Sequence, residues 1–185
     1  MIPKKTALIL GCCLALVCFL SALALAEAEP QVGQMVSIKF PKPMSDEDAK
    51  YLGLPKAEEF TVKDIKAPFL LVEQFNTTCP HCMAQAPVLN SLYDKVQSDP
   101  QLKEKLKFMA IGQGNDESAI KMWKAFNKVP FPLFPDPNST FGKAINFSPY
   151  PVSVVLDKTG KIVWAHVGTF DSADEALQGI KAAVK

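Results

Sequence analysis

Residues 69–82 read FLLVEQFNTTCPHC, and this stretch predicts both a local structure and a chemistry. Residues 69–75 are a mostly apolar run of strand length, which is typical of a strand buried on both faces. The stretch ends in two cysteines separated by Pro80 and His81. Because proline loses no hydrogen bond in the first turn of a helix, a helix is expected to begin at Pro80. The sequence therefore predicts a strand that delivers Cys79 to the N-terminus of a helix.

The N-terminal 26 residues have the pattern of a secretory signal peptide. Lys4 and Lys5 precede an apolar stretch over residues 7–26, which ends in the small-x-small pattern that signal peptidase accepts. We expect cleavage after Ala26 and an exported protein, periplasmic or otherwise extracytoplasmic. The stretch is about 20 residues long, which is also enough to cross a bilayer. A retained membrane anchor is therefore the alternative, and only then would the protein contact the membrane.

The remaining residues, 27–185, have the length of one domain and can bury a core. Loss of Lys4 and Lys5 changes the formal net charge from +1 to −1, so no strong field attracts nucleic acid or anionic lipid. Cys79 and Cys82 are the only two cysteines left, which excludes a structural disulfide framework. Such a pair suits a site that cycles between dithiol and disulfide.

The pattern outside residues 69–82 predicts an α/β domain. The elements expected after the first strand are a helix over 80–97, a strand over 106–112, a helix starting at 115–118, a short helix over 139–145, strands over 152–156 and 161–167, and a helix after Ser172. Residues 35–40 alternate weakly like a strand, and the Pro-rich residues 129–137 are expected to break regular structure. Trp123, Trp164 and Phe126 are expected in the core.

The predicted position of Cys79 favours a reactive thiolate. The unpaired backbone N–H groups and the dipole at a helix N-terminus stabilise negative charge on sulfur. The His81 ring can donate to the Cys79 sulfur or carry positive charge near it. Both effects stabilise the reduced form, so the disulfide is expected to be oxidising. Cys82, one turn deeper in the helix that Pro80 opens, is expected to be the shielded resolving thiol.

Glu73 is the other residue of this stretch with chemical potential. It stands six residues before Cys79, inside a strand that is otherwise apolar. A buried carboxyl there is expected to have a raised pKa and to accept the Cys82 proton during exchange. The alternative is an acid that faces solvent or pairs with a lysine. Buried, unpaired acids are uncommon without a function, which favours the first interpretation.

These residues resemble the thioredoxin superfamily, and more narrowly the secreted TlpA/ResA-like thiol–disulfide oxidoreductases. In the thioredoxin pattern a buried acid stands six residues before the first cysteine and a helix proline five after the second, as Glu73 and Pro87 do here. The resemblance implies that Pro151 is a cis proline facing the dithiol. It also implies that Tyr150 lines the groove for the substrate backbone.

The resemblance covers roughly residues 60–184 and implies a thioredoxin-like fold, a central mixed β-sheet flanked by helices. It divides the mature chain into an N-terminal extension over residues 27–59 and a thioredoxin-like domain over residues 60–185. A TlpA-type insertion is expected between the βαβ unit and the final hairpin, around residues 131–136.

The Cys-Pro-His-Cys tetrapeptide departs from that subfamily and resembles the oxidising DsbA proteins. Glu73, in place of an aspartate, shares this resemblance, whereas Thr78 stands where a tryptophan usually precedes the first cysteine. The combined resemblance implies disulfide exchange with cysteines of envelope proteins, a membrane or soluble redox partner, and no cofactor. It leaves the direction of electron flow open.

Three other functions fit the pattern less well. A peroxiredoxin needs a threonine at the position of Asn76 and an arginine, and this chain has neither. A copper chaperone would have to use Cys79, Cys82 and the distant His166, which is a thin ligand set, so no metal site is expected. A non-catalytic binding module would make the two cysteines dispensable, which their predicted position at a helix N-terminus argues against.

Overall fold

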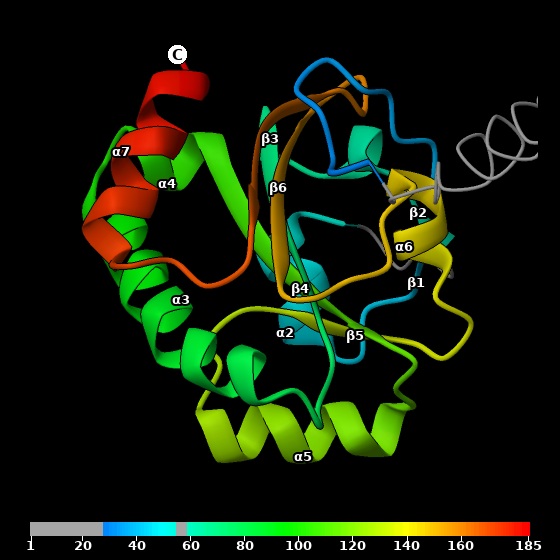
Figure 1. The fold of residues 1–185 in the computed structure, drawn as a ribbon. Helices are drawn as coiled ribbons and strands as arrows, with labels where there is room; N and C mark the ends of the chain where they lie inside the picture. The colour runs from blue at the N-terminus through cyan, green and yellow to red at the C-terminus, as the bar shows by residue number, and fades with distance from the viewer. Residues whose placement is uncertain (1–27, 55–58) are drawn as a thin grey trace, which may run out of the picture.

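The computed structural model describes residues 28–54 and 59–185 of the chain. Its elements in chain order are β1 (Phe40–Pro41), α2 (Asp46–Leu52), β2 (Glu59–Phe60), the 3-10 turn η1 (Val62–Asp64), β3 (Phe69–Phe75), α3 (Pro80–Ser98), α4 (Leu102–Lys105), β4 (Leu106–Gln113), α5 (Glu117–Asn127), β5 (Leu133–Asp136), α6 (Thr140–Ile145), β6 (Val152–Asp157), β7 (Ile162–Val167) and α7 (Ala173–Ala183). Figure 1 shows a central sheet with helices on both sides. The predicted α/β architecture with a mixed sheet flanked by helices is confirmed.

The central sheet has five strands in the order β5-β4-β3-β6-β7. β3 occupies the middle, parallel to β4 and antiparallel to β6, so the strand that leads to the cysteines has hydrogen-bonded neighbours on both edges. In this register Glu73 lies between Ala110 of β4 and Ser153 of β6. The most central strand of the sheet therefore carries the candidate acid.

Side chains of β3 alternate between two apolar layers. Leu71 and Phe75 pack in the layer formed with α3, α5 and α7, whereas Leu70 and Val72 pack in the layer formed with α2 and α6. This alternation follows from the period of two along a strand. All four side chains are nearly or fully buried, as predicted for a strand covered on both faces.

Serine residues cap the N-termini of two helices, α2 and α7. The Ser45 hydroxyl accepts a hydrogen bond from the Asp48 N–H at the start of α2. The Ser172 hydroxyl accepts one from the Glu175 N–H at the start of α7, the helix predicted after Ser172. Both caps satisfy a backbone donor that the helix leaves unpaired.

The structure corrects the prediction that residues 129–137 contain no regular element, because β5 lies within them. The Ala110 N–H donates to the Pro132 carbonyl at 2.9 Å, and the Gly114 N–H donates to the Asp136 carbonyl at 2.8 Å. Proline has no N–H but keeps its carbonyl, so a Pro-rich segment can join a sheet as an edge strand.

The strand predicted over residues 35–40 is also wrong in most of its length. Met35 makes an isolated bridge with Lys161, and regular pairing is limited to β1 and β2. Val36 and Phe40 are 4% and 0% exposed. The alternation in this segment therefore reflects burial against the main sheet rather than strand pairing.

Phe126 was expected in the core, but its side chain is 77% exposed, whereas Trp123 is 8% exposed. Ile120 and Trp123 define the buried side of α5. Each residue of an α-helix turns by about 100°, so Phe126 is rotated by about 120° from Ile120 and leaves that side. Ile120, Trp123 and Phe126 are spaced three residues apart, and two such steps in succession are too many to keep all three side chains on one narrow face of the helix.

The predicted signal segment, residues 1–26, lies outside the described residues. Within residues 28–54 and 59–185, no helix is long and apolar enough to cross a membrane. The proposed boundary at residue 60 stays a prediction. Pairing of Phe40 with Phe60 joins the two predicted parts across that boundary.

Candidate active site

Cys79 is the N-cap residue of α3. Its Sγ accepts a hydrogen bond from the backbone N–H of Cys82 at 3.1 Å. Cys79 is 7% exposed and Cys82 is 2% exposed, and both are present as thiols. The first turn of α3 therefore directs an N–H group and the positive end of the helix dipole at the Cys79 sulfur.

The loop between β3 and α3 is fixed by side-chain hydrogen bonds. The Asn76 amide nitrogen donates to the Gln113 carbonyl at 2.8 Å, and its amide oxygen accepts from the Thr78 N–H at 2.9 Å. The Thr77 N–H donates to the side-chain oxygen of Asn115 at 3.0 Å. These bonds tie the loop to the end of β4, so the position of the first cysteine depends on two strands.

Glu73 lies beneath the start of α3 and is 2% exposed. Burial raises the pKa of its carboxyl from 4.5 to about 8, and a hydrogen bond from the Ser153 hydroxyl to Oε2 opposes this rise. The alternative of a solvent-facing or lysine-paired acid is wrong for the described part of the chain, where no lysine pairs with Glu73. The predicted rise in pKa is confirmed.

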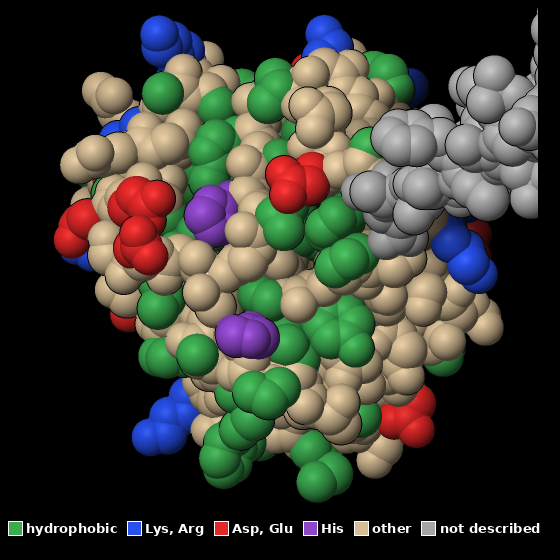
Figure 2. All heavy atoms as spheres, viewed as in Figure 1, with side chains coloured by type: hydrophobic (Ala, Val, Ile, Leu, Met, Phe, Trp, Pro, Cys, Tyr) green, Lys and Arg blue, Asp and Glu red, His purple; other side chains and the backbone are tan. Residues whose placement is uncertain are grey.

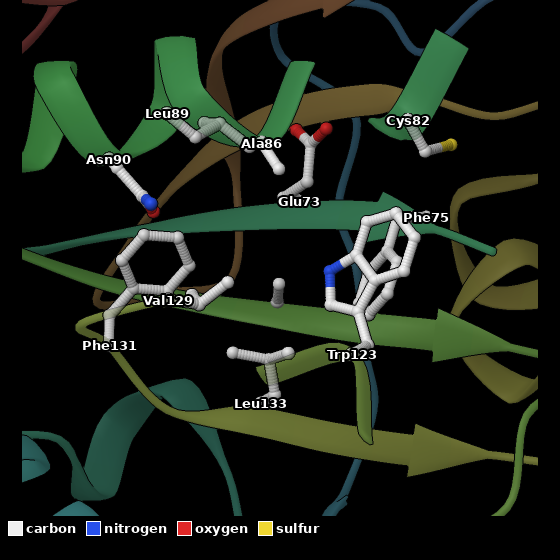
Figure 3. A pocket seen from close by; sticks show the side chains of 11 residues that line it. Glu73, Phe75, Cys82, Ala86, Leu89, Asn90, Trp123, Val129, Phe131 and Leu133 are labelled. Atoms are coloured by element: carbon white, nitrogen blue, oxygen red, sulfur yellow. The ribbon is translucent and has the colours of Figure 1, made fainter. Parts of the chain in front are cut away.

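Glu73 and Cys82 line a common cavity of about 20 Å³. Figure 3 shows the Glu73 carboxyl rising from β3 toward α3, with Cys82 at the start of that helix and Asn90 farther along it. The buried Glu73 Oε1 and Asn90 Oδ1 have no hydrogen-bond partner among the described residues. A cavity of this size holds about one water molecule, which these acceptors can bind.

The Cys82 thiol is held in its protonated form. Burial raises its pKa most, and its hydrogen bond with Cys79 raises it further. The charge of Glu73 also acts in this direction. Since Cys82 must lose its proton to attack a disulfide, it needs a base nearby. Glu73 is the acid that the structure places beside it.

The Tyr150–Pro151 peptide bond is cis, as the resemblance implied. This bond brings the Tyr150 carbonyl oxygen to 4.0 Å from the Cys79 Sγ. Pro151 is buried and directly precedes β6, while the Tyr150 side chain is 38% exposed. The structure therefore brings Tyr150 and Pro151 together with the dithiol.

Two buried glutamines, which the sequence analysis missed, hold the loop before this cis bond. The Gln74 amide nitrogen donates to the carbonyls of Phe147 and Pro149 at 3.2 and 3.0 Å. The Gln113 amide nitrogen donates to the Ser148 carbonyl at 3.0 Å. Their signal in the sequence is a side-chain amide at the end of an apolar strand, next to Glu73 in one case.

His81 occupies the second position of α3 and is exposed. In the described structure its ring makes no hydrogen bond with Cys79. Pro80 occupies the first position of the helix, as predicted.

His166 lies apart from the dithiol. Its ring is 4.7 Å from the Phe170 ring between centroids, and its Nε2 is 3.2 Å from the Thr169 carbonyl oxygen. Across the described residues, no group of three or more His, Cys, Asp or Glu side chains is placed to hold a metal ion. The ligand set Cys79, Cys82 and His166 of the copper-chaperone alternative is therefore not assembled.

Comparison with known sequences identifies a family and several relatives. The Redoxin profile matches residues 41–180. The thiol-disulfide oxidoreductase ResA of a Bacillus cereus strain is 26% identical over 125 residues, which cover 67% of this chain and 68% of ResA. ResA of Geobacillus kaustophilus is 23% identical over 128 residues, with 68% and 71% covered.

Solved structures share the fold at low sequence identity. StoA from Bacillus subtilis superposes with a TM-score of 0.59 and 19% identity, covering 80% of this chain and 99% of StoA. A thiol:disulfide interchange protein of the thioredoxin family from Chlorobium tepidum TLS gives 0.60 and 17%, covering 85% and 100%. These likenesses confirm the thioredoxin-like fold that the sequence predicted.

Proposed function

This chain belongs to the Redoxin family and is a TlpA/ResA-like member of the thioredoxin superfamily, and we propose that it is an exported thiol–disulfide oxidoreductase acting on envelope proteins. The observation that carries the proposal is the hydrogen bond from the Cys82 N–H to the Cys79 Sγ at the N-terminus of α3. It places a hydrogen-bond donor at the Cys79 sulfur, above the buried carboxyl of Glu73 and beside the cis bond at Pro151.

The reaction needs three groups and no cofactor. In the reducing direction, the Cys79 thiolate attacks a disulfide of the partner protein, so that a mixed disulfide forms and one partner sulfur leaves as a thiolate. Cys82 transfers its proton to Glu73 and attacks the Cys79 sulfur. The mixed disulfide breaks, the second partner sulfur leaves, and Cys79 and Cys82 form a disulfide. In the oxidising direction the same steps run in reverse.

The pKa values of the two buried groups suit this proton transfer. The carboxyl of Glu73, with a pKa of about 8, gains and loses a proton near neutral pH. A base with a pKa near the working pH combines a useful fraction of the deprotonated form with enough proton affinity. The cavity that Glu73 and Cys82 both line is large enough for about one water molecule, which would connect the carboxyl to the thiol.

Tyr150 and Pro151 are proposed to bind the backbone of the substrate. The loop lies against the Cys79 sulfur, and an extended peptide can pair with such a loop as an added strand. Gln74 and Gln113 fix the loop through three of its carbonyl groups. The loop would therefore hold its conformation before the substrate backbone binds to it.

The reduction potential of the Cys79–Cys82 pair, measured against glutathione, tests the function and its direction. We expect a value toward the DsbA end of the scale, about −120 mV, because the helix N-terminus and His81 both stabilise the reduced form. A value near that of thioredoxin, about −270 mV, would instead assign a reductant. A pair that does not equilibrate with glutathione would contradict the proposal.

We predict that His81→Ala lowers the reduction potential by about 30 mV, equivalent to about 1.4 kcal/mol for two electrons. An imidazole near the Cys79 sulfur can carry positive charge. Its removal would make the reduced form less stable relative to the disulfide. His166→Ala is the matched control, since His166 is the only other histidine of the chain and lies apart from the dithiol. An equal shift in both variants would remove His81 from this role.

Export is tested on the full chain expressed in a bacterial host. We expect the protein in the extracytoplasmic fraction, with Glu27 as its first residue after N-terminal sequencing. A membrane-bound protein that begins at residue 1 would support the retained anchor. An unprocessed protein in the cytoplasm would contradict the proposed location.

A further inference from the structure

Three large apolar side chains near the dithiol are exposed to solvent. Met83, directly after Cys82 in α3, is 46% exposed, and Met122 and Phe126 of α5 are 72% and 77% exposed. Met122 and Phe126 are four residues apart and so share one side of α5. Figure 2 shows hydrophobic side chains gathered at the lower part of the face in view, over α5 and the start of α3.

These side chains border a groove of about 330 Å³ between the start of α3 and α5. Its walls are formed by Thr77, Met83, Ala119, Met122, Trp123, Phe126 and Asn127. None of these residues is charged, and a groove of this kind complements an uncharged, apolar group. Large apolar side chains that cluster on the surface of a protein commonly mark a binding site.

The groove adjoins the reacting atoms through covalent and packing contacts. Thr77 stands two residues before Cys79, and the Met83 N–H donates to the Cys79 carbonyl at 3.1 Å. The Trp123 ring lies 5.0 Å from the Phe75 ring and lines both this groove and the cavity that holds Glu73. The groove therefore lies beside the first turn of the helix that carries both cysteines, and it shares the Trp123 ring with the cavity of Glu73.

We propose that this groove binds a large apolar side chain of the substrate protein, located within a few residues of the reacting cysteine. The inference rests on the proposed function, because a substrate sulfur that reaches Cys79 brings its neighbouring residues over the adjoining surface. Since Cys79 is only 7% exposed, the substrate must come close to the protein to react. The groove then selects for apolar residues beside the cysteine.

Two synthetic peptides test this selection. Each contains one cysteine as a mixed disulfide with glutathione, and they differ only in having leucine or serine two residues before and after it. A reductant converts each mixed disulfide to peptide thiol and glutathione while Cys79 and Cys82 form a disulfide, and an oxidant runs the same reaction in reverse. The second-order rate constant is measured in the direction that the reduction potential of the protein favours. Burial of a leucine side chain is expected to make the leucine peptide react about tenfold faster.

The double variant Met122→Ser, Phe126→Ser is expected to reduce this ratio from about ten to about one. Both side chains are mostly exposed, so the fold should tolerate the change, and thermal unfolding checks it. Val32→Ser is the matched control, because Val32 is 68% exposed and does not line the groove, and it should keep the ratio. A ratio near one in the unchanged protein, or one that survives the double variant, would overturn the inference.

Failure of the inference and of the proposed function can be told apart. If the protein exchanges with both peptides at equal rates, it is an oxidoreductase without this selectivity. If it exchanges with neither peptide in either direction and does not equilibrate with glutathione, the proposed function fails and the inference fails with it.

Tryptophan fluorescence gives a second test that needs no reaction. The chain has two tryptophans, so Trp164→Phe leaves Trp123 in the groove wall as the single fluorophore. The leucine peptide with its cysteine changed to serine should change the Trp123 emission, because its side chain occupies the groove that the ring lines. The serine peptide should not. Equal emission with both peptides would contradict binding in the groove.

Discussion

Cys79→Ser is expected to lower thiol–disulfide exchange to the rate of the uncatalysed reaction. A serine hydroxyl forms no disulfide, and Cys82 is too buried and too firmly protonated to replace Cys79 as the attacking thiol. The measurement is the reduction of insulin, or of the leucine peptide, followed at equal protein concentration. Exchange at the parental rate would show that the attacking cysteine has been assigned wrongly.

Cys82→Ser distinguishes the roles of the two cysteines, because it is expected to leave an unresolved mixed disulfide on Cys79. Attack by Cys79 should still occur, but the mixed disulfide cannot be resolved and should accumulate as a covalent complex that dithiothreitol releases. Mass spectrometry of the trapped complex should identify Cys79 as the bonded residue. Because both cysteines are buried, thermal unfolding of both variants is needed to show that neither loss arises from unfolding.

The local structure around the dithiol could be predicted because neighbouring residues determine it. An apolar run of strand length, a short polar loop and a proline at the first helical position define β3, the loop and the start of α3. The acid at Glu73 stands out for the same reason, as a charge inside an apolar run. Burial raises the pKa of the Glu73 carboxyl, and this burial could be inferred without knowing which residues surround the side chain.

Long-range contacts could not be predicted in this way. Ser153 donates to Glu73 from 80 positions away, and Gln113 reaches the loop before Pro151 across 35 positions. Such pairs depend on the register of strands that touch only after folding. Their polar character in apolar strands marks each residue as unusual, but it does not name the partner.

The groove was hidden from the sequence because Phe126 looked like a core residue. Aromatic side chains are usually buried, and a spacing of three from Trp123 agrees with a helix face. Only the three-dimensional arrangement shows that Trp123 fills the space between α5 and β3, while Phe126 is left outside. For Phe126, the local sequence pattern thus predicts burial in the core, whereas the proposed function requires an exposed side chain.

Glu73→Gln is expected to slow the resolution of the mixed disulfide by about 10²-fold or more near neutral pH, which is the usual contribution of a general base. In the unchanged protein the resolution rate should rise with pH through about 8, as Glu73 loses its proton and becomes able to accept that of Cys82. The variant should lack this inflection. Rapid-quench measurement of the trapped intermediate over pH 6–10 checks both effects.

A matched control exists in Glu104→Gln, which makes the same chemical change at an exposed position. It should leave the resolution rate and its pH dependence unaltered. If Glu73→Gln resolves the mixed disulfide at the parental rate, Glu73 is not the proton acceptor.

The same substitution should change how stability depends on pH. The folded state holds the Glu73 proton up to a pKa of about 8, whereas the unfolded chain releases it near 4.5. Between these values the folded state binds more protons, so the free energy of unfolding falls as pH rises, by up to about 5 kcal/mol at about 1.4 kcal/mol per pH unit. This contribution is fully present below about pH 4.5 and is lost above about pH 8.

Glu73→Gln carries no titrating group and should lack that decline, so the reduced variant should be more stable than the reduced parent at pH 9 and should gain least at pH 4. Urea unfolding of both proteins at the two pH values measures the difference. A gain in stability at high pH together with a loss in resolution rate would mean that the buried carboxylate is kept for catalysis at a cost to the fold. Parallel stability curves would instead show that the Glu73 carboxyl titrates alike in the folded and unfolded chains, and its assignment as a buried base would fail.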